Sequence, residues 1–228
     1  MEEEKEITKQ RRYSNVKPED CALIIIDMQN DFIRENGQYA KQGIDISHMV
    51  RTVKPIQKMV DFCRKMNIPI IVARYLIRDL IDCGLICKIR PLLAQGGLRE
   101  GSWGANIIDE LEINLQKKDW LIDRPRSSCF FSTRLELLLR GLNRKTLIVT
   151  GVLTNQCIES TIRDALFRDF EVLELSDCVG TIGGTMVDPI TRERVKVKAE
   201  DLHNASLRAV AFGLGDVITS GELIEELG

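Results

Sequence analysis

The feature that most constrains this chain is a set of short apolar runs, rich in β-branched residues, that do not alternate with polar ones. The clearest of these runs are residues 22–26 (ALIII), 69–73 (PIIVA) and 146–152 (TLIVTGV). A continuous apolar run predicts a strand that is buried on both faces, as strands are in a parallel sheet. Further short strands are predicted at residues 120–122, 171–175 and 217–219.

Segments with apolar residues at helical spacing separate these strands. We predict helices over residues 49–63, 107–115, 135–142, 155–168 and 202–212. Thr133 and Glu136 have capping-box spacing at the start of the third helix. The apolar stripe of the last helix consists of Leu202, Ala205, Ala209 and Phe212. Strands that alternate with helices indicate an α/β fold with a doubly wound, mostly parallel sheet and helices on both faces.

The domain organisation follows from length and from where the apolar pattern begins. A chain of 228 residues is within the range of one α/β domain. Residues 1–20 are mostly charged and predict a solvated N-terminal arm, and residues 21–228 predict a single domain. In residues 183–199 a turn signal at Asp188-Pro189 precedes alternating residues, which predicts a hairpin or another excursion of the chain before the last helix.

The charge balance narrows the range of partners. The formal net charge of -2 leaves no basic excess to attract a nucleic acid or an anionic membrane. No apolar run approaches the roughly 20 residues that span a bilayer. The first seventeen residues lack the apolar centre of a secretory signal. We therefore expect a cytoplasmic protein that acts on a small molecule.

The cysteines and histidines indicate neither a disulfide framework nor a metal site. Seven cysteines without CxxC spacing fit small buried side chains in a reducing compartment, although Cys83 and Cys87 are only four apart. The only histidines are His48 and His203, too few for a histidine-rich metal site. His203, at a polar position of the last helix, is expected to face solvent or to form a local cap and not to act as a catalytic base.

Three candidate catalytic residues fall at one edge of the predicted sheet. Asp27 ends the first strand, Arg124 follows the strand at 120–122, and Cys157 lies in the first turn of the helix after residue 152. In an open α/β sheet, ligands bind beyond the carboxyl ends of the strands, where all three would lie. The sequence therefore predicts an acid, a cation and a thiol in one site.

These residue types suit nucleophilic attack on a carbonyl group. A cysteine near a helix N-terminus and close to Arg124 is favoured as a thiolate, which is a strong nucleophile. Asp27 could take up or deliver the proton. Backbone N–H groups of the turn at Leu153 and Cys157 could hold the oxyanion.

Each residue also has a purely structural interpretation. A cysteine at a helix start is often a buried, inert side chain. Asp27 could cap a turn, as could Asp31. Arg124 and Arg126 could pair with surface carboxylates for little energy.

The chain resembles the isochorismatase-like cysteine hydrolase superfamily, through four blocks at residues 23–32, 101–111, 126–135 and 150–165. The resemblance covers nearly all of the chain after the arm. It implies a six-stranded, Rossmann-like sheet and an Asp–Lys–Cys triad in which the cysteine attacks a C–N carbonyl. It also implies a cis peptide bond at Val152–Leu153 and a homodimer or homotetramer. Asp27 matches the acid of the triad, and Cys157 matches the nucleophile.

Two departures from the family pattern narrow the expected chemistry. Arg124 stands where the family usually has lysine, and an arginine keeps the charge but has a larger, forked head. Residues 74–82 contain no histidine, whereas the nicotinamidase branch has an Asp-x-His-x-x-His metal site there. We therefore expect no metal and no cofactor. Members that cleave isochorismate often lack the cysteine, so Cys157 favours amide hydrolysis over ether cleavage.

The resemblance implies a metal-independent cysteine amidohydrolase, related to N-carbamoylsarcosine and ureidoacrylate amidohydrolases, that cleaves a small amide or an N-carbamoyl or ureido compound through a thioester. Arg124 would give electrostatic support to Cys157 and Asp27. The residues expected to line the substrate pocket are Gln29, Phe32, Tyr75, Trp103 and Phe130. Two alternatives remain: a non-catalytic binding protein, suggested by Arg124, and an ether hydrolase of isochorismatase type.

Overall fold

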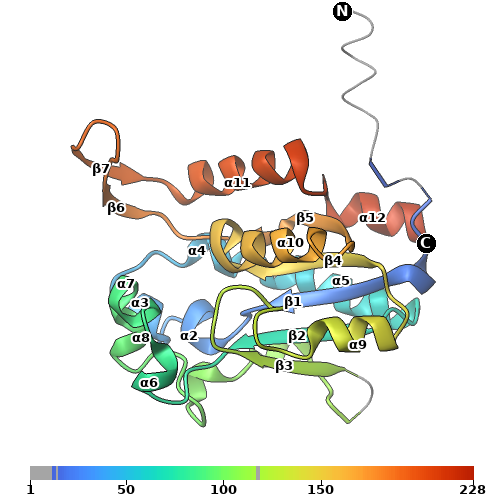
Figure 1. Ribbon diagram of the computed structural model, residues 1–228, viewed down its shortest axis with the longest axis horizontal. Helices are drawn as coiled ribbons and strands as arrows, with labels where there is room; N and C mark the ends of the chain where they lie inside the picture. Colours follow the sequence, from blue (N-terminus) through green and yellow to red (C-terminus); the bar gives the residue numbers. More distant parts are fainter. Residues whose placement is uncertain (1–11, 14, 117–118) are drawn as a thin grey trace, which may run out of the picture.

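A computed structural model, which describes residues 12–13, 15–116 and 119–228, has a six-stranded sheet at its centre (Figure 1). The strand order is β3-β2-β1-β4-β5-β8, and each neighbouring pair is parallel. The strands are β1 (Cys21–Ile26), β2 (Ile70–Tyr75), β3 (Trp120–Arg124), β4 (Thr146–Val152), β5 (Glu171–Gly180) and β8 (Asp216–Ile218). Every residue of β1 and β4 is buried, which accounts for their continuous apolar runs. The predicted doubly wound α/β fold is confirmed.

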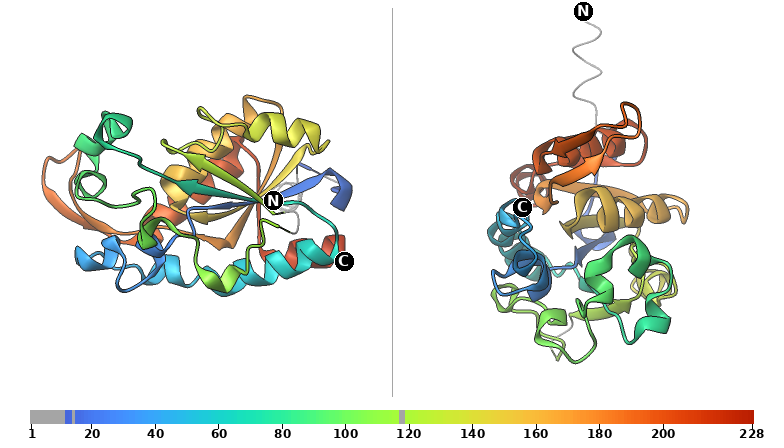
Figure 2. Two further views of the ribbon diagram at one scale, coloured as in Figure 1. Left: turned by 90° about the horizontal axis from the view of Figure 1, so that it is seen from below. Right: turned by 90° about the vertical axis from the view of Figure 1, so that its left-hand side faces the viewer.

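Helices cover both faces of this sheet. α5 (Val53–Lys65) and α12 (Ser220–Leu227) lie on one face, and α9 (Leu135–Gly141) and α10 (Glu159–Leu166) lie on the other (Figure 2). α11 (Ala199–Gly213) packs against β5, β8 and α10. Apolar residues at helical spacing are buried on α5, as the sequence predicts: Ile56, Met59, Val60 and Cys63.

Short helices gather beyond the carboxyl ends of the strands (Figure 1). They are α2 (Asn30–Ile33), α3 (Gln38–Lys41), α4 (Ser47–Val50), α6 (Leu80–Cys83), α7 (Ile86–Ile89) and α8 (Pro91–Ala94). The predicted hairpin is present as an antiparallel pair, β6 (Gly184–Val187) and β7 (Arg194–Val197), which projects from the same end. Single 3-10 turns are η1 (Pro18–Asp20), η2 (Trp103–Ala105) and η3 (Asp109–Leu111).

The predicted helix over residues 107–115 is wrong, because only the short η3 forms there. The N–H of Ile108 donates to the carbonyl of Met28 at 3.0 Å, and Ile107 forms a bridge with Gln29. Backbone groups that a helix would use are thus paired with the segment that follows β1. Glu112, in a left-handed conformation with a φ of 48°, then ends the turn.

The predicted capping box before α9 does not form. Thr133 Oγ1 accepts a hydrogen bond from the N–H of Leu135 and itself donates to the carbonyl of Cys129. Glu136 instead accepts a hydrogen bond from Arg168, at 3.1 Å. The tertiary ion pair has therefore replaced the local cap.

α11 presents the predicted apolar stripe outward instead of inward. Its buried residues are His203, Ser206 and Val210, whereas Phe212 is 90% exposed and Ala205 is also exposed. A polar inner face is possible because His203 and Ser206 form hydrogen bonds beneath the helix. The prediction that His203 faces solvent is wrong for the same reason.

The cysteines and the N-terminal segment also have specific environments. Cys83 and Cys87 form a disulfide between α6 and α7, contrary to expectation, and five other cysteines are free and buried.

Most of the predicted arm, residues 1–11 and 14, lies outside the described residues. Its described end is bound to the domain, because the N–H groups of Arg12 and Tyr13 donate to Asp216. None of the helices in the described part of the chain has the length and apolar character needed to cross a bilayer.

Candidate active site

Asp27 is held at the end of β1 in a fixed, fully buried position. Its φ of 57° is left-handed, a conformation that aspartate tolerates better than most residues. Its N–H donates to the carbonyl of Ala73 at 2.9 Å, and Oδ1 accepts the N–H of Tyr75 at 3.0 Å. Gly151 allows this packing, because a side chain there would collide with the carbonyl of Ile26. The carboxylate is therefore aimed across the carboxyl ends of the strands.

Arg124, the last residue of β3, pairs with Asp27 inside the protein. Nη2 lies 2.5 Å from Oδ2 of Asp27, and both side chains are fully buried. Nη1 donates to the carbonyl of Arg126, and the guanidinium lies 5.0 Å from the ring centroid of Tyr75. Nε has no hydrogen-bond partner. Arg124 thus occupies the predicted place of the cation and is directly bonded to the predicted acid.

Cys157 lies in η4 (Thr154–Ile158), a wide helical turn between β4 and α10. The peptide bond before this turn, Val152–Leu153, is cis, as the resemblance implies. The carbonyl of Cys157 accepts a hydrogen bond from Thr161 Oγ1 at 2.7 Å, which ties the turn to α10. The thiol is buried and forms a hydrogen bond with Asp27. The structure therefore brings all three predicted catalytic residues together.

The electrostatics of the site favour a protonated thiol. Burial, and then the charge of Asp27, raise the pKa of Cys157 to about 12, although Arg124 and Arg90 act in the opposite direction. Burial likewise raises the pKa of Asp27 above its ordinary value, against the effect of Arg124. Burial thus opposes the thiolate that the helix N-terminus and Arg124 were expected to favour. A thiolate would have to form by proton transfer to the adjacent carboxylate of Asp27.

A polar network supports the turn that contains Cys157. Nδ1 of His203 lies 3.1 Å from Thr154 Oγ1, and Nε2 lies 3.3 Å from Nη2 of Arg51. Because a guanidinium can only donate, Nε2 must accept, and Nδ1–H donates to the threonine. Burial, followed by the charges of His48 and Arg51, lowers the pKa of His203 to about 4. The imidazole is therefore neutral at pH 7.

Two further contacts complete this network. Ser206 Oγ donates to the carbonyl of Thr154 at 3.3 Å, and Thr181 Oγ1 donates to Asn155 Oδ1 at 2.6 Å. Sequence reasoning missed His203 and Ser206. A usable signal exists, since His203, Ser206 and Val210 recur at helical spacing and form the buried face of α11.

The residues expected to line the substrate pocket have different surroundings. Gln29 is buried, but its amide is occupied by backbone groups of Tyr75 and Ala105. The Phe32 ring packs on Tyr39, with centroids 4.7 Å apart. Tyr75 lies beside Arg124, as described above. Of the remaining two, Trp103 is 49% exposed, and Phe130 stacks on Phe170.

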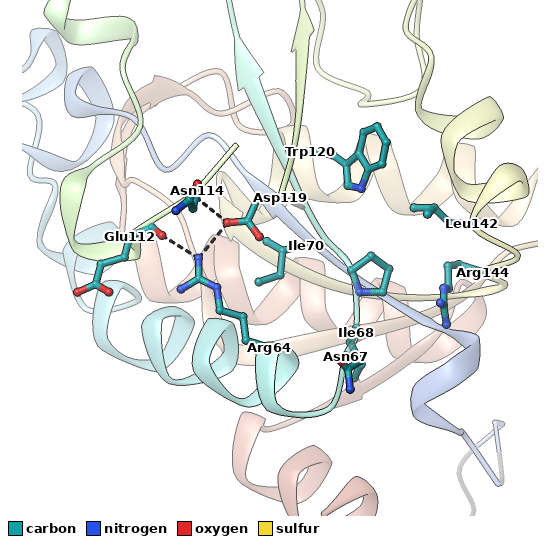
Figure 3. A pocket seen from close by; sticks show the side chains of 11 residues that line it. Arg64, Asn67, Ile68, Ile70, Glu112, Asn114, Asp119, Trp120, Leu142 and Arg144 are labelled. Atoms are coloured by element: carbon teal, nitrogen blue, oxygen red, sulfur yellow. Dashed lines mark hydrogen bonds and ion pairs between the residues drawn. The ribbon is translucent and has the colours of Figure 1, made fainter. Parts of the chain in front are cut away.

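No group of three or more metal-binding side chains occurs among the residues that the structure describes. A cavity of about 680 Å³ lies at the opposite edge of the sheet, near the amino ends of β2 and β3 (Figure 3). Its lining includes Arg64, which pairs with Asp119 at 2.9 Å. This cavity is therefore separate from the site around Cys157.

Comparisons with known proteins identify the protein family to which this chain belongs. The structure is similar to that of a cysteine hydrolase from Pseudomonas syringae pv. phaseolicola, with a TM-score of 0.83, 29% identity, and coverage of 96% of this chain and 97% of that chain. The profile of the Isochorismatase domain matches residues 21–222. The chain belongs to the isochorismatase family, which confirms the resemblance inferred from the sequence blocks.

Named relatives within this class are amidohydrolases. A ureidoacrylate amidohydrolase, RutB, from Acinetobacter baylyi is 32% identical over 174 residues, which are 70% of each chain. The corresponding protein from Agrobacterium fabrum is 29% identical over 190 residues, 77% of this chain and 82% of the relative. An N-carbamoylsarcosine amidase from Thermoplasma acidophilum shares the fold at 21% identity, with a TM-score of 0.65 and coverage of 88% of this chain and 96% of that chain.

Proposed function

We propose that this protein is a metal-independent cysteine hydrolase that cleaves a C–N bond of a small amide or of an N-carbamoyl or ureido compound. The observation that carries the proposal is the contact of Cys157 with Asp27, which is itself bonded to Arg124 at 2.5 Å. The names of the relatives, amidohydrolases of ureidoacrylate, support the same substrate class.

In the first half-reaction, Asp27 takes the thiol proton and the sulfur of Cys157 attacks the carbonyl carbon. N–H groups near Leu153 and Cys157 would hold the negative oxygen of the tetrahedral intermediate. Asp27 then gives its proton to the departing nitrogen. The C–N bond breaks, ammonia or an amine leaves, and a thioester remains (a thiocarbamate when the substrate is a ureido compound).

In the second half-reaction, Asp27 removes a proton from a water molecule, whose oxygen attacks the thioester carbon. Collapse of the second tetrahedral intermediate breaks the C–S bond and returns the proton to sulfur. A raised pKa suits Asp27 for this work, because it must hold a proton between steps. Arg124 cannot lose its proton and would act as a fixed positive charge.

The test is ammonia release from a panel of small amides and ureido acids. Cys157→Ala should abolish release that the wild type performs. Cys178→Ala is the matched control, because Cys178 is another buried, free cysteine on the central sheet. Circular dichroism of both variants separates loss of chemistry from loss of fold. Release that survives in Cys157→Ala would exclude this cysteine as the nucleophile.

A second candidate is a non-catalytic binding protein. Arg124 favours it, since the usual lysine is replaced by a residue locked between Asp27 and the carbonyl of Arg126. This alternative would be supported if the wild type released no ammonia from any substrate and the Arg124→Lys variant did release it.

We further propose a homodimer or homotetramer, as the family resemblance implies, and a cytoplasmic location, as expected from the sequence. The exposed apolar face of α11, which includes Phe212 and Ala205, supports self-association. Sedimentation of the full chain tests the oligomeric state.

A further inference from the structure

His48, on α4, is a largely buried histidine that lies against the end of β5. Its side chain is 11% exposed. The backbone of α4 can approach β5 closely because Gly180 has no side chain, since a Cβ there would lie 2.5 Å from the carbonyl oxygen of His48. Figure 1 shows α4 near the end of β5 from which the hairpin of β6 and β7 leaves. The fold therefore fixes His48 beside the last residues of β5.

The hydrogen bonds of the His48 imidazole determine its tautomer. Nδ1 accepts a hydrogen bond from the backbone N–H of Thr181 at 3.1 Å, so Nδ1 carries no proton. Burial, and then the charge of Arg51, lower the pKa of His48, which keeps the ring neutral at pH 7. The single ring proton is therefore on Nε2, which donates to the carboxylate of Glu200 at 3.3 Å.

Arg51, the residue that follows α4, serves the second histidine of this cluster. Its Nη2 lies 3.1 Å from Nε2 of His48, but both of these atoms carry protons, so the contact is not a hydrogen bond. The same Nη2 donates to Nε2 of His203 at 3.3 Å, and Nδ1 of His203 is the donor to Thr154. The two imidazoles, whose ring centroids are 4.9 Å apart, thus have opposite tautomers.

Both histidines act on the turn that contains the proposed nucleophile. Thr181 is fully buried between His48 and this turn, because its Oγ1 donates to Oδ1 of Asn155 at 2.6 Å. Asn155 lies in η4, two residues before Cys157. The neighbouring residue of η4, Thr154, is the one that the second histidine holds. The segment of α4 and the residue after it therefore controls two consecutive residues of the turn.

We propose that His48 is a positioning residue, whose unprotonated Nδ1 holds the turn of Cys157 in place through Thr181. The role belongs to this one ring atom and not to the ion pair with Glu200, whose side chain is 63% exposed and contributes little. This inference rests on the proposed function, because the position of the sulfur matters for its attack on a carbonyl carbon. An error of about 1 Å in such a position lowers a rate by about a hundredfold.

Two substitutions of His48 separate this role from general packing. The side-chain oxygen of asparagine can occupy the place of Nδ1, whereas that of glutamine reaches the place of Nε2. His48→Gln should therefore lower kcat for ammonia release by about tenfold to a hundredfold, with KM changed by less than about threefold. His48→Asn, which still accepts the N–H of Thr181, should keep kcat within about threefold of the wild type. Equal losses in both variants, or no loss in His48→Gln, would overturn the inference.

Glu200→Ala is the control on the other side of the ring. It removes the acceptor of the Nε2 proton, which water can replace at this exposed position, and it leaves Nδ1 of His48 unchanged. The value of kcat should stay within about twofold of the wild type. A loss as large as that in His48→Gln would assign the effect to the ion pair and would overturn the role given to Nδ1.

Hydrogen–deuterium exchange of the full chain needs no substrate and separates this inference from the proposed function. Within the turn, the N–H groups of Gln156 and Ile158 donate to the carbonyl of Leu153 at 3.0 and 3.2 Å. Their exchange should be about tenfold faster in His48→Gln and unchanged in His48→Asn. This result in a protein that releases no ammonia would refute the proposed hydrolysis and keep the positioning role. Ammonia release with the same exchange in all three proteins would overturn the inference and keep the proposed function.

Discussion

Glu174 is a buried carboxyl group whose ionisation should control how stability depends on pH. It lies within β5, is fully buried, and neither carboxyl oxygen has a hydrogen-bond partner. Burial, with a smaller contribution from the charge of Glu159, raises the pKa of Glu174 from its ordinary 4.5 to about 8. The folded state therefore holds the proton more tightly than the unfolded chain does.

The sign and size of the effect follow from this difference. Well below pH 4.5 the carboxyl is protonated in both states and contributes no pH dependence. As pH rises from there to about 8, the unfolded state loses the proton first, and the free energy of unfolding falls by about 1.4 kcal/mol per pH unit. The loss is about 3 kcal/mol at pH 7 and levels off near about 5 kcal/mol above pH 8.

Glu174→Gln removes the ionisation and keeps the size of the side chain. The variant should match the wild type near pH 4, exceed it by about 3 kcal/mol at pH 7, and exceed it by about 5 kcal/mol at pH 9. Urea unfolding at these three values, at one protein concentration, measures the difference. Glu225→Gln, on the exposed face of α12, changes the same charge and should have little effect. A stability difference that does not grow with pH would refute the reasoning.

Three further substitutions test the site. Asp27→Asn should lower kcat for ammonia release by about a hundredfold to ten thousandfold, because the proton carrier is lost while the size is kept; activity near that of the wild type would contradict the assigned role. Arg124→Met should lower the free energy of unfolding by about 3–5 kcal/mol in urea, since the fully buried carboxylate of Asp27 loses its partner; an unchanged midpoint would exclude a stabilising ion pair. His203→Leu should lower kcat by about tenfold by releasing Thr154, and His203→Asn, which keeps a donor, should recover most of it; equal loss in both variants would indicate general damage to packing.

The central sheet was predictable because its signal is local. A strand buried on both faces must be apolar at every position, so β1 and β4 stand out without any knowledge of their neighbours. Residues 107–115 have equally clear helical spacing, yet Ile108 pairs with Met28 in the structure. The spacing shows only which residues are apolar. The hydrogen bonds that the backbone forms depend on the segments that the tertiary fold places beside it.

The face of α11 was mispredicted for a related reason. Leu202 and Phe212 belong to the most apolar stripe, but the helix buries His203 and Ser206 because Thr154 offers them hydrogen bonds. A polar residue can occupy the interior when its partner is in place, and that partner lies about fifty residues away in sequence. Hydrophobicity within one segment cannot reveal it.

The positions of site residues were predictable from the sequence where the topology of the sheet alone determines them. Arg124 ends β3, and Asp27 and Cys157 come after β1 and β4; parallel strands bring their carboxyl ends to one edge. Arg90 follows no strand, and its place near the thiol depends on how the segment of α6 to α8 folds back over the sheet. Such a position has no local signature in the sequence.

The charges around Cys157 explain why the thiol stays protonated until the moment of attack. Asp27 and Arg124 neutralise each other, so Arg90 leaves one uncompensated positive charge beside the sulfur. Burial nevertheless outweighs this charge and keeps the pKa of Cys157 at about 12. Attack on the carbonyl must therefore be coupled to proton transfer to Asp27, with the negative charge passing directly to the oxyanion near Leu153.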